Sequence, residues 1–341
     1  MGTPTAFRWA IIGTGQIARK LAEDLSRQSD MTISVVVSRQ HERGARFARE
    51  FSPTAAILDH PTALVGRTDV DAVYIATPHT QHVDAAMTAL TAGLPVLCEK
   101  PMGINTAEVA RLVDTARRHD TFLMEAMWNR FLPVMQDFHG LLADNTIGEP
   151  RTLFAEFSIC PPYDPRSRLF DPTQAGGALL DVGIYTIALA HQIFGTPTRV
   201  TGSAGFTTTG VDGYGVYTLE FACGGRALLH GSLQRDTPGN ALLTGSRGHI
   251  QLGPPFYRPT RTCMETSAGI RDDRERAIDG HGYGYEARAV KEAVTEGLIE
   301  HPVMPHRESV AIAGTMDHLR AQWGLRYPAE SLEQAPLPVI H

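Results

Sequence analysis

Short aliphatic runs alternate with amphipathic segments from residue 7 to about residue 125. The runs are RWAII, TISVVVS, DAVYIAT, LPVLCEK and TFLMEAM, and segments such as QIARKLAEDLSRQ and NTAEVARLVDTARRHD between them have helical spacing. Strands that are apolar on both faces and joined by amphipathic helices are typical of a parallel, doubly wound α/β sheet. The pattern therefore predicts a dinucleotide-binding domain of the Rossmann type over residues 1–126.

After about residue 128 the apolar residues alternate with polar ones, in the runs TLFAEFSI, GYGVYTLEFA, RALLHGSLQ and GHIQLG. A period of two is typical of an antiparallel sheet with one face on a core and the other face more polar. Helical patterns interrupt these strands in GALLDVGIYTIALAHQIF, GYEARAVKEAVTEGL and RESVAIAGTMDHLRAQWG. We therefore expect a C-terminal α+β domain on a mostly antiparallel open sheet, over residues 127–341, for substrate binding and dimerisation.

Composition narrows the class of protein. The 341 residues are 43% hydrophobic, enough for two cores, and a net charge of −6 without a Lys/Arg block makes nucleic acid an unexpected partner. The four cysteines form no C-x-x-C pair, the start MGTPTAF has no signal-peptide pattern, and no run has the roughly 18 apolar residues of a membrane span. These features predict a cytoplasmic protein without a membrane partner.

The segment WAIIGTGQIARKLAEDL carries G-x-G-x-x-A between a strand and a helix. Gly13 permits the tight turn, Gly15 leaves room for a pyrophosphate, and Ala18 keeps the helix close to the strand. Phosphate oxygens can then bind the free N–H groups at the helix start. The alternative is an ordinary Gly-rich turn. The predicted cofactor-binding residues here are Gly13, Thr14, Gly15, Gln16 and Ile17.

The end of the second strand indicates which cofactor is bound. NAD sites usually have Asp or Glu there, whereas Arg suits the 2′-phosphate of NADP. This chain has VVVSRQHERG, with Ser38 and Arg39 at that position and Arg43 one turn later. The sequence favours NADP(H), although both arginines could simply be solvated at a helix start.

Polar side chains follow two further strands at the carboxyl edge of the sheet, where ligands bind in such folds. They are Thr77, His79 and His82 in YIATPHTQHV, and Glu99 and Lys100 in VLCEKP. All five are predicted to contact the cofactor. A metal site is not predicted, because the two histidines have no third ligand in a matching pattern.

Lys100 is followed by Pro101, which fixes the backbone and allows either a trans or a cis bond. In AGGALLDVGIYTIALAHQ, Asp181 and Tyr185 are four residues apart and share one face of the predicted helix. A buried carboxylate and phenol need partners. Either they carry chemistry, or Asp181 caps a helix turn and Tyr185 is a core aromatic.

The chain resembles the glucose-fructose oxidoreductase and inositol dehydrogenase family, and within it the dihydrodiol dehydrogenase branch. The likeness covers nearly the whole chain, through GTGQIA, TPHTQHV, LCEKPMG, FLMEAMWNRFLP, AGGALLDVGIYTI, YEARAVKEAVTEGLIEHPVMPHRES and WGLRYP. The resemblance implies that Lys100 and Tyr185 are the catalytic pair. Many relatives carry a histidine in place of the tyrosine, so Tyr185 favours the dihydrodiol and glucose-fructose branches. The resemblance also implies a homodimer through the open sheet face; a tetramer remains open.

The chemistry is consistent with this pair. Oxidation of an alcohol removes its proton as hydride leaves, and a tyrosine does this only if a nearby cation favours the phenolate. Lys100 could supply that charge, and in reduction Tyr185 would protonate the alkoxide. Asp181 could bind a substrate hydroxyl or hold the lysine. Trp128 is expected to form a pocket wall, or alternatively to pack between domains.

Three functions are therefore compared. The leading one is a cytoplasmic NADP-dependent oxidoreductase acting on an aldose such as xylose, a keto sugar or a vicinal dihydrodiol. A second is an NADPH-dependent reductase of a keto or 1,5-anhydro sugar that uses the same residues. A third, of another class, is a non-catalytic NADP(H)-binding redox sensor, which would not need Lys100, Asp181 and Tyr185. The sequence does not choose the substrate or the direction of the reaction.

Overall fold

The computed structural model describes residues 6–330, and contacts divide the chain into two compact units. The first contains Met1–Gly103, Glu108–Phe131 and Ile278–Ser309, and the second contains Ile104–Ala107, Leu132–Ala277 and Val310–His341. This division differs from the single boundary expected after residue 126. The chain leaves the first unit and returns to it near the C-terminus.

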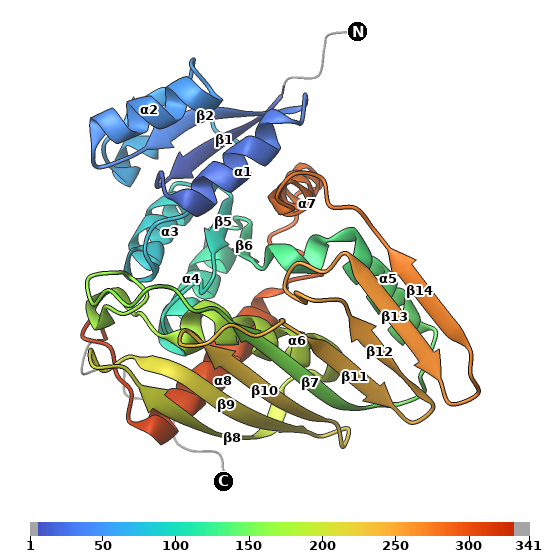
Figure 1. Ribbon diagram of the computed structural model, residues 1–341. Helices are drawn as coiled ribbons and strands as arrows, with labels where there is room; N and C mark the ends of the chain where they lie inside the picture. The colour runs from blue at the N-terminus through green and yellow to red at the C-terminus, as the bar shows by residue number, and fades with distance from the viewer. Residues whose placement is uncertain (1–5, 331–341) are drawn as a thin grey trace, which may run out of the picture. The chain divides into compact units, whose positions relative to one another are not determined.

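The first unit is built on a parallel six-stranded sheet with the order β3-β2-β1-β4-β5-β6 (Figure 1). The strands are β1 (Phe7–Ile12), β2 (Met31–Val37), β3 (Ala56–Leu58), β4 (Ala72–Ile75), β5 (Val96–Glu99) and β6 (Leu123–Ala126). The helices that belong wholly to this unit are α1 (Gln16–Ser26), α2 (His41–Phe51), α3 (His82–Thr91) and α7 (Tyr283–Thr295); α4 (Thr106–Arg118) begins in the second unit. The five aliphatic runs are confirmed as strands; only the short β3 was not among them. This is the strand order of a Rossmann fold.

Helix α7 belongs to the first unit because Asp24 of α1 binds its start. The buried Asp24 carboxylate accepts hydrogen bonds from the N–H groups of His281 (2.8 Å), Tyr283 (2.8 Å) and Gly284 (3.1 Å). After α7, Ile299 accepts a hydrogen bond from the N–H of Leu123 in the edge strand β6, at 3.0 Å. The segment that follows the second sheet in sequence thus completes the first unit.

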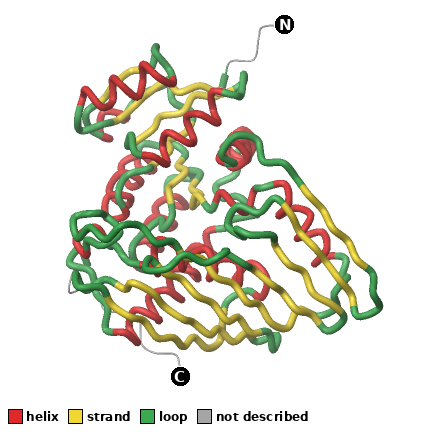
Figure 2. The backbone as a smooth tube through the Cα atoms, viewed as in Figure 1, coloured by secondary structure: helices red, strands yellow, loops and turns green. Residues whose placement is uncertain are grey.

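The second unit contains an eight-stranded sheet with the order β14-β13-β12-β11-β7-β10-β9-β8. Its strands are β7 (Pro150–Ser158), β8 (Pro197–Phe206), β9 (Asp212–Phe221), β10 (Arg226–Ser232), β11 (Ala241–Gly245), β12 (Gly248–Leu252), β13 (Arg261–Thr266) and β14 (Arg271–Glu275). Neighbours are antiparallel except for β7 and β10. Helices α5 (Pro133–Ala143), α6 (Ile184–Phe194) and α8 (His306–Trp323) lie along one face of it (Figures 1 and 2). The predicted mostly antiparallel open sheet is confirmed.

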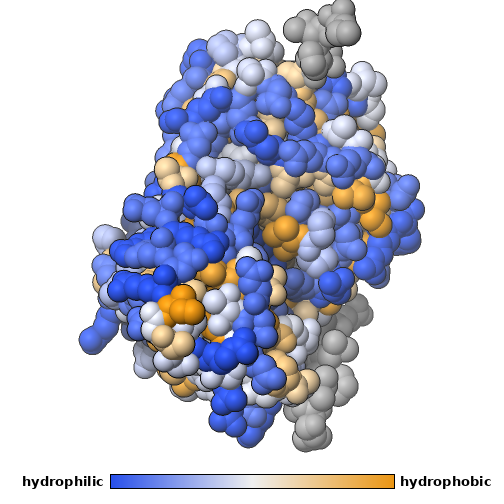
Figure 3. All heavy atoms as spheres, turned by 90° about the vertical axis from the view of Figure 1, so that its right-hand side faces the viewer, coloured by the Kyte–Doolittle hydropathy of each residue, from blue (hydrophilic) through white to orange (hydrophobic). Residues whose placement is uncertain are grey.

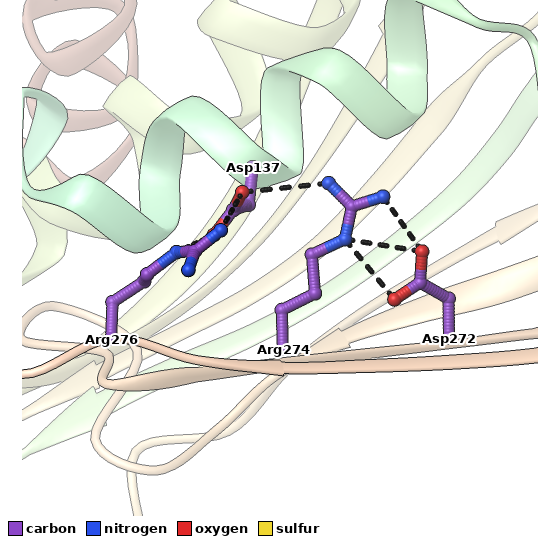
Figure 4. A network of polar contacts seen from close by, with 4 residues as sticks. All are labelled: Asp137, Asp272, Arg274 and Arg276. Atoms are coloured by element: carbon purple, nitrogen blue, oxygen red, sulfur yellow. Dashed lines mark hydrogen bonds and ion pairs between the residues drawn. The ribbon is translucent and has the colours of Figure 1, made fainter.

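The edge strand β14 is protected by charge. All five of its residues are charged, and the side of the molecule that carries it is largely hydrophilic (Figure 3). Asp137 of α5 accepts hydrogen bonds from Arg276 at 2.6 and 3.0 Å and lies 3.4 Å from Arg274, which also pairs with Asp272 (Figure 4). Charged edges of this kind oppose pairing with another chain.

One segment of the second unit is unusually apolar. The segment Pro172–Phe194 is long enough and apolar enough to cross a membrane by length and composition, with a mean hydropathy of 1.4 in its window. However, 83% of that window is buried inside the protein. Its apolar residues are those of a core helix that packs on β7 and β10.

Candidate active site

The turn between β1 and α1 requires glycine at position 13 and is open at position 15. Gly13 has φ of +100°, and a Cβ on it would lie 2.5 Å from the carbonyl oxygen of Ala76. Gly15 is exposed and precedes α1 without a side-chain cap, and no heavy atom lies within 4 Å of its Cβ position. Thr14, Gln16 and Ile17 complete a turn that offers backbone N–H groups to solvent at the helix start. The residues therefore fit a dinucleotide pyrophosphate.

Thr77 follows β4 beside this turn. Its backbone nitrogen lies 3.3 Å from the Cβ position of Gly13, and its buried hydroxyl has no hydrogen-bond partner among residues 6–330. A buried hydroxyl without a partner costs about 1–3 kcal/mol. A polar atom of a bound dinucleotide could satisfy it, which is a second observation that fits a cofactor at this edge.

Strand β2 is followed directly by Ser38 and Arg39 and not by a carboxylate, and Arg43 comes next to Glu42 in the first turn of α2. Arg39 and Arg43 are exposed, and neither makes an ion pair with a residue that the structure describes. Ser38 donates a hydrogen bond to the carbonyl of Gln40 at 3.0 Å, and Gly44 allows α2 to pack closely against Ser38. A hydroxyl and two guanidinium groups can bind a phosphate at this position.

Glu99 and Lys100 end β5 with their polar groups held differently. The Glu99 carboxylate accepts a hydrogen bond from the buried Tyr74 hydroxyl at 2.5 Å and from the Lys100 N–H at 3.2 Å. Burial, together with the negative charge of Glu99, raises the pKa of Tyr74 well above its usual value. Lys100 is half-buried, and its bond to Pro101 is cis. Glu99 thus anchors the strand end within the unit, and its contact with a cofactor stays a prediction.

Two aromatic rings lie after β6 and at the start of α7. Trp128 is 5% exposed and stacks on Tyr283, with ring centroids 4.9 Å apart and planes inclined by 19°. Sequence reasoning expected Trp128 as a pocket wall, and its role toward a substrate stays a prediction. Tyr283 was missed, because GYGYEARAV carries only a helical pattern.

In the second unit, Asp181 lies in a π-helical turn, Leu179–Gly183, that precedes α6. Gly183 allows this turn to approach β9, because a Cβ there would lie 2.7 Å from the Tyr217 hydroxyl. Asp181 is 8% exposed and pairs with Arg168 at 3.0 Å. The continuous α-helix expected here is therefore interrupted, and π-turns of this kind are frequent at functional sites.

Tyr185 follows in the first turn of α6 and lies among aromatic rings. It is 6% exposed, its ring is perpendicular to Phe157 at 5.4 Å, and Tyr257 lies 6.2 Å away. Phe157 and Tyr257 stack at 3.8 Å. The ring of Tyr185 thus packs among aromatic rings. Sequence reasoning missed Phe157, Tyr257 and Arg168, which are distant from Tyr185 along the chain.

Asp212 fixes the start of the turn that carries Asp181. Its fully buried carboxylate accepts a hydrogen bond from the N–H of Leu179 at 2.6 Å. A Cβ on Gly177, whose φ is +121°, would lie 2.1 Å from the other carboxylate oxygen. Burial raises the pKa of Asp212 to about 7, opposed by hydrogen bonds from backbone N–H groups. Gly177 therefore makes room for this carboxyl group, and Gly176 makes room for the carbonyl groups of Arg168 and Leu169.

The predicted residues thus form two sets. The glycine turn, Ser38, the two arginines, Thr77, both histidines, Glu99, Lys100 and Trp128 belong to the first unit, and Asp181 and Tyr185 belong to the second. The residues of each set are held in place by contacts within their own unit. The pairing of Lys100 with Tyr185 stays a prediction.

The parallel sheet and glycine turn define an oxidoreductase with a dinucleotide-binding domain, and comparisons with known proteins identify its family. The model of an oxidoreductase family with an NAD-binding Rossmann fold matches residues 7–127, and that of the GFO/IDH/MocA C-terminal domain matches residues 135–251. The chain belongs to the GFO/IDH/MocA family of oxidoreductases. The resemblance noted from the motifs is confirmed.

Similar proteins cover the whole fold. Trans-1,2-dihydrobenzene-1,2-diol dehydrogenase of Mus musculus is 34% identical over 95% of this chain and 99% of its own, and that of Homo sapiens is 32% identical with the same coverage. The structure of a 3-ketoreductase from Actinomadura kijaniata in complex with NADP and TDP-benzene matches with a TM-score of 0.81 and 27% identity, over 93% and 98% of the two chains. An aldose-aldose oxidoreductase from Caulobacter crescentus, with a TM-score of 0.82, 20% identity and coverage of 92% and 96%, shares the fold.

We predict that Asp212→Asn changes how the stability of the protein depends on pH. Because the native pKa of about 7 lies above the usual 3.8, Asp212 contributes stability below pH 4 that is lost as pH rises to 7. Asparagine keeps an acceptor for Leu179 but does not ionise. In urea unfolding, the free energy of unfolding of the variant should rise relative to that of the native protein, by up to about 1.4 kcal/mol for each pH unit over this range. Asp236→Asn, at an exposed position, should show no such trend; a parallel trend in both would contradict the prediction.

Proposed function

We propose that the protein is an NADP-dependent oxidoreductase that transfers hydride between the nicotinamide and a sugar or a vicinal dihydrodiol. The observation that carries the proposal is Tyr185, a buried phenol four residues after the ion-paired Asp181, in a chain that also places Lys100 after a dinucleotide-binding strand. The family match and the diol dehydrogenases that share about a third of its residues support this substrate class.

Tyr185 is proposed to exchange the proton. A bound nicotinamide would supply or accept the hydride, and the residues must then handle the charge on the substrate oxygen. Tyr185 takes the hydroxyl proton in oxidation or returns it in reduction, while Lys100 stabilises the phenolate or alkoxide. Asp181 accepts a hydrogen bond from a neighbouring substrate hydroxyl. The ketoreductase from Actinomadura kijaniata has solved structures in which a lysine or a tyrosine is substituted, the two residue types proposed here.

The aromatic rings around Tyr185 suit a carbon ring. Phe157 and Tyr257 offer apolar surface beside the ring of Tyr185, whereas Asp181 on the preceding turn and its partner Arg168 offer polar groups. A sugar or dihydrodiol presents both kinds of surface. The same residues would serve an NADPH-dependent reductase of a keto or 1,5-anhydro sugar. The direction of the reaction therefore has to be determined by assay.

NADP(H) is proposed over NAD(H) because of the charges at the end of β2. Arg39 and Arg43 would bind the 2′-phosphate, and the position directly after the strand is Ser38 rather than the carboxylate that would bind a free 2′-hydroxyl. The NADP complex of the ketoreductase is consistent with this choice.

A homodimer is proposed to form through the open face of the eight-stranded sheet, in a cytoplasmic protein. This face exposes large apolar residues on adjacent strands: Phe154 (46%), Leu228 (44%) and Val216 (50%). Leu228 is paired in register with Phe154, and Val216 lies on the next strand. Contiguous apolar surface of this kind is typical of an interface.

Tyr185→Phe is expected to lower kcat by about 10²–10⁴, because the variant keeps the ring but loses the proton donor. Purified protein would be assayed for NADPH formation with aldoses, inositols and trans-dihydrodiols, and for NADPH oxidation with keto sugars. Tyr214→Phe, on the exposed sheet face, is the matched control and should keep full activity. Undiminished turnover by Tyr185→Phe would show that Tyr185 is not the proton donor. Tight NADPH binding without turnover on any compound would favour the redox sensor.

Arg43→Ala should weaken NADP⁺ binding by about 10- to 100-fold and leave NAD⁺ binding nearly unchanged, because only NADP⁺ carries the phosphate. Titration calorimetry with both nucleotides measures the two affinities. Arg46→Ala, in the same helix and equally exposed, is the control. Equal losses for both nucleotides would argue against a 2′-phosphate site.

Leu228→Asp should convert the dimer to a monomer of 37.1 kDa in light scattering, because it buries a carboxylate in the apolar interface. Ile270→Asp, at the 62% exposed turn between β13 and β14, should leave the mass unchanged. A native protein that is already monomeric, or a dimer that persists in Leu228→Asp, would refute this interface.

A further inference from the structure

His82 joins the ends of two neighbouring strands. It is the first residue of α3 and is 1% exposed. Its Nδ1 lies 2.9 Å from the carbonyl oxygen of Pro101, and its Nε2 lies 2.8 Å from the carbonyl oxygen of Thr77. Both distances are those of hydrogen bonds. One ring therefore connects the residue after β4 to the residue after Lys100.

The two contacts restrict the protonation of the ring. A carbonyl oxygen only accepts hydrogen bonds, whereas a neutral imidazole has one N–H donor and one acceptor nitrogen. With a neutral ring, one nitrogen lone pair would face a carbonyl oxygen at less than 3 Å, and that carbonyl would lose its partner. Only the doubly protonated ring donates to both.

The loop after β5 is held by other backbone contacts as well. The buried Glu125 of β6 accepts a hydrogen bond from the N–H of Met102 at 2.9 Å, and Glu99 accepts one from the N–H of Lys100. The carbonyl of Pro101, between these two donors, is the group that His82 binds. The ring thus sets where the backbone of this loop lies relative to Thr77.

Titratable groups lie on the segments that hold the two carbonyl partners of the ring. The carboxyl groups of Glu99 on β5 and Glu125 on β6 favour a positive ring when they are ionised. His79, whose ring centroid is 5.9 Å away, and Lys100 oppose it when they are charged. The thiol of Cys98 on β5 is buried, which raises its pKa well above the usual value, so it stays neutral.

We propose that His82 is a positioning residue that acts as a doubly protonated ring and fixes the Lys100–Pro101 segment against the end of β4. The proposal rests on the role proposed above for Lys100. The link is complete at low pH and weakens as pH rises, because the neutral ring keeps only one of its two carbonyl partners. The position of Lys100 then depends on the protonation of a residue outside the reacting groups.

The direct test is ¹⁵N NMR of histidine-labelled whole protein, without substrate, with the signals of His82 assigned by their loss in His82→Gln. At pH 7.5 both ring nitrogens of His82 should show the shifts of protonated nitrogen. If His82→Gln does not fold, His82→Asn serves for the assignment. A single neutral tautomer at pH 7.5 overturns the proposal, whatever the activity of the protein.

The functional test is the pH profile of kcat. His82→Gln should lower kcat by about 10-fold at pH 6.5 and progressively less as pH rises to 9, with little change in the KM of the substrate, because glutamine has one donor nitrogen. His119→Gln should follow the native profile. A His82→Gln profile parallel to the native one would overturn the role of protonation. If Lys100→Ala keeps full activity while NMR finds the doubly protonated ring, the proposed function fails and the assignment of His82 stands.

Discussion

Backbone N–H and C=O groups just beyond a strand or at the start of a helix need hydrogen-bond partners. The rest of this structure depends on the side chains that supply them. Four buried side chains bind such groups. Asp24 binds three N–H groups at the start of α7, and Asp212 binds one at the start of the π-turn. Glu125 binds the N–H of Met102, and His82 binds two carbonyls. Each unsatisfied group would cost about 1–3 kcal/mol, so the edges that carry the candidate site are held by polar contacts.

Glycines accompany these contacts because the polar groups and the backbone approach one another closely. Gly13 lies against the carbonyl group of Ala76, Gly177 lies against the Asp212 carboxylate, and Gly183 lies against the Tyr217 hydroxyl. In each case the Cβ of any other residue would lie 2.7 Å or less from an oxygen atom. The glycine-rich motifs of the sequence are therefore steric requirements in both units, beyond the cofactor turn for which such motifs are known.

The sequence predicted the features that depend on local pattern. Strands buried on both faces give unbroken aliphatic runs, and the glycine turn, Lys100 and Tyr185 lie in short motifs. Contacts between distant segments leave no such signal. Asp212 is 33 residues from Leu179, and Asp24 is more than 250 residues from the helix that it caps. The periodicity of α7 shows an apolar face but not which sheet it covers, and the π-turn has the composition of an ordinary helix.

The return of residues 278–309 to the first unit affects how the chain can be made and divided. A ribosome that has synthesised strands β1–β6 has not yet produced α7 or the residues that pair with the edge of β6. The dinucleotide-binding unit therefore stays incomplete until almost the whole chain has emerged. No single cut releases it intact, although its family model ends at residue 127. The second unit is therefore an insertion in the chain of the first, and the first unit closes only when the chain returns to it.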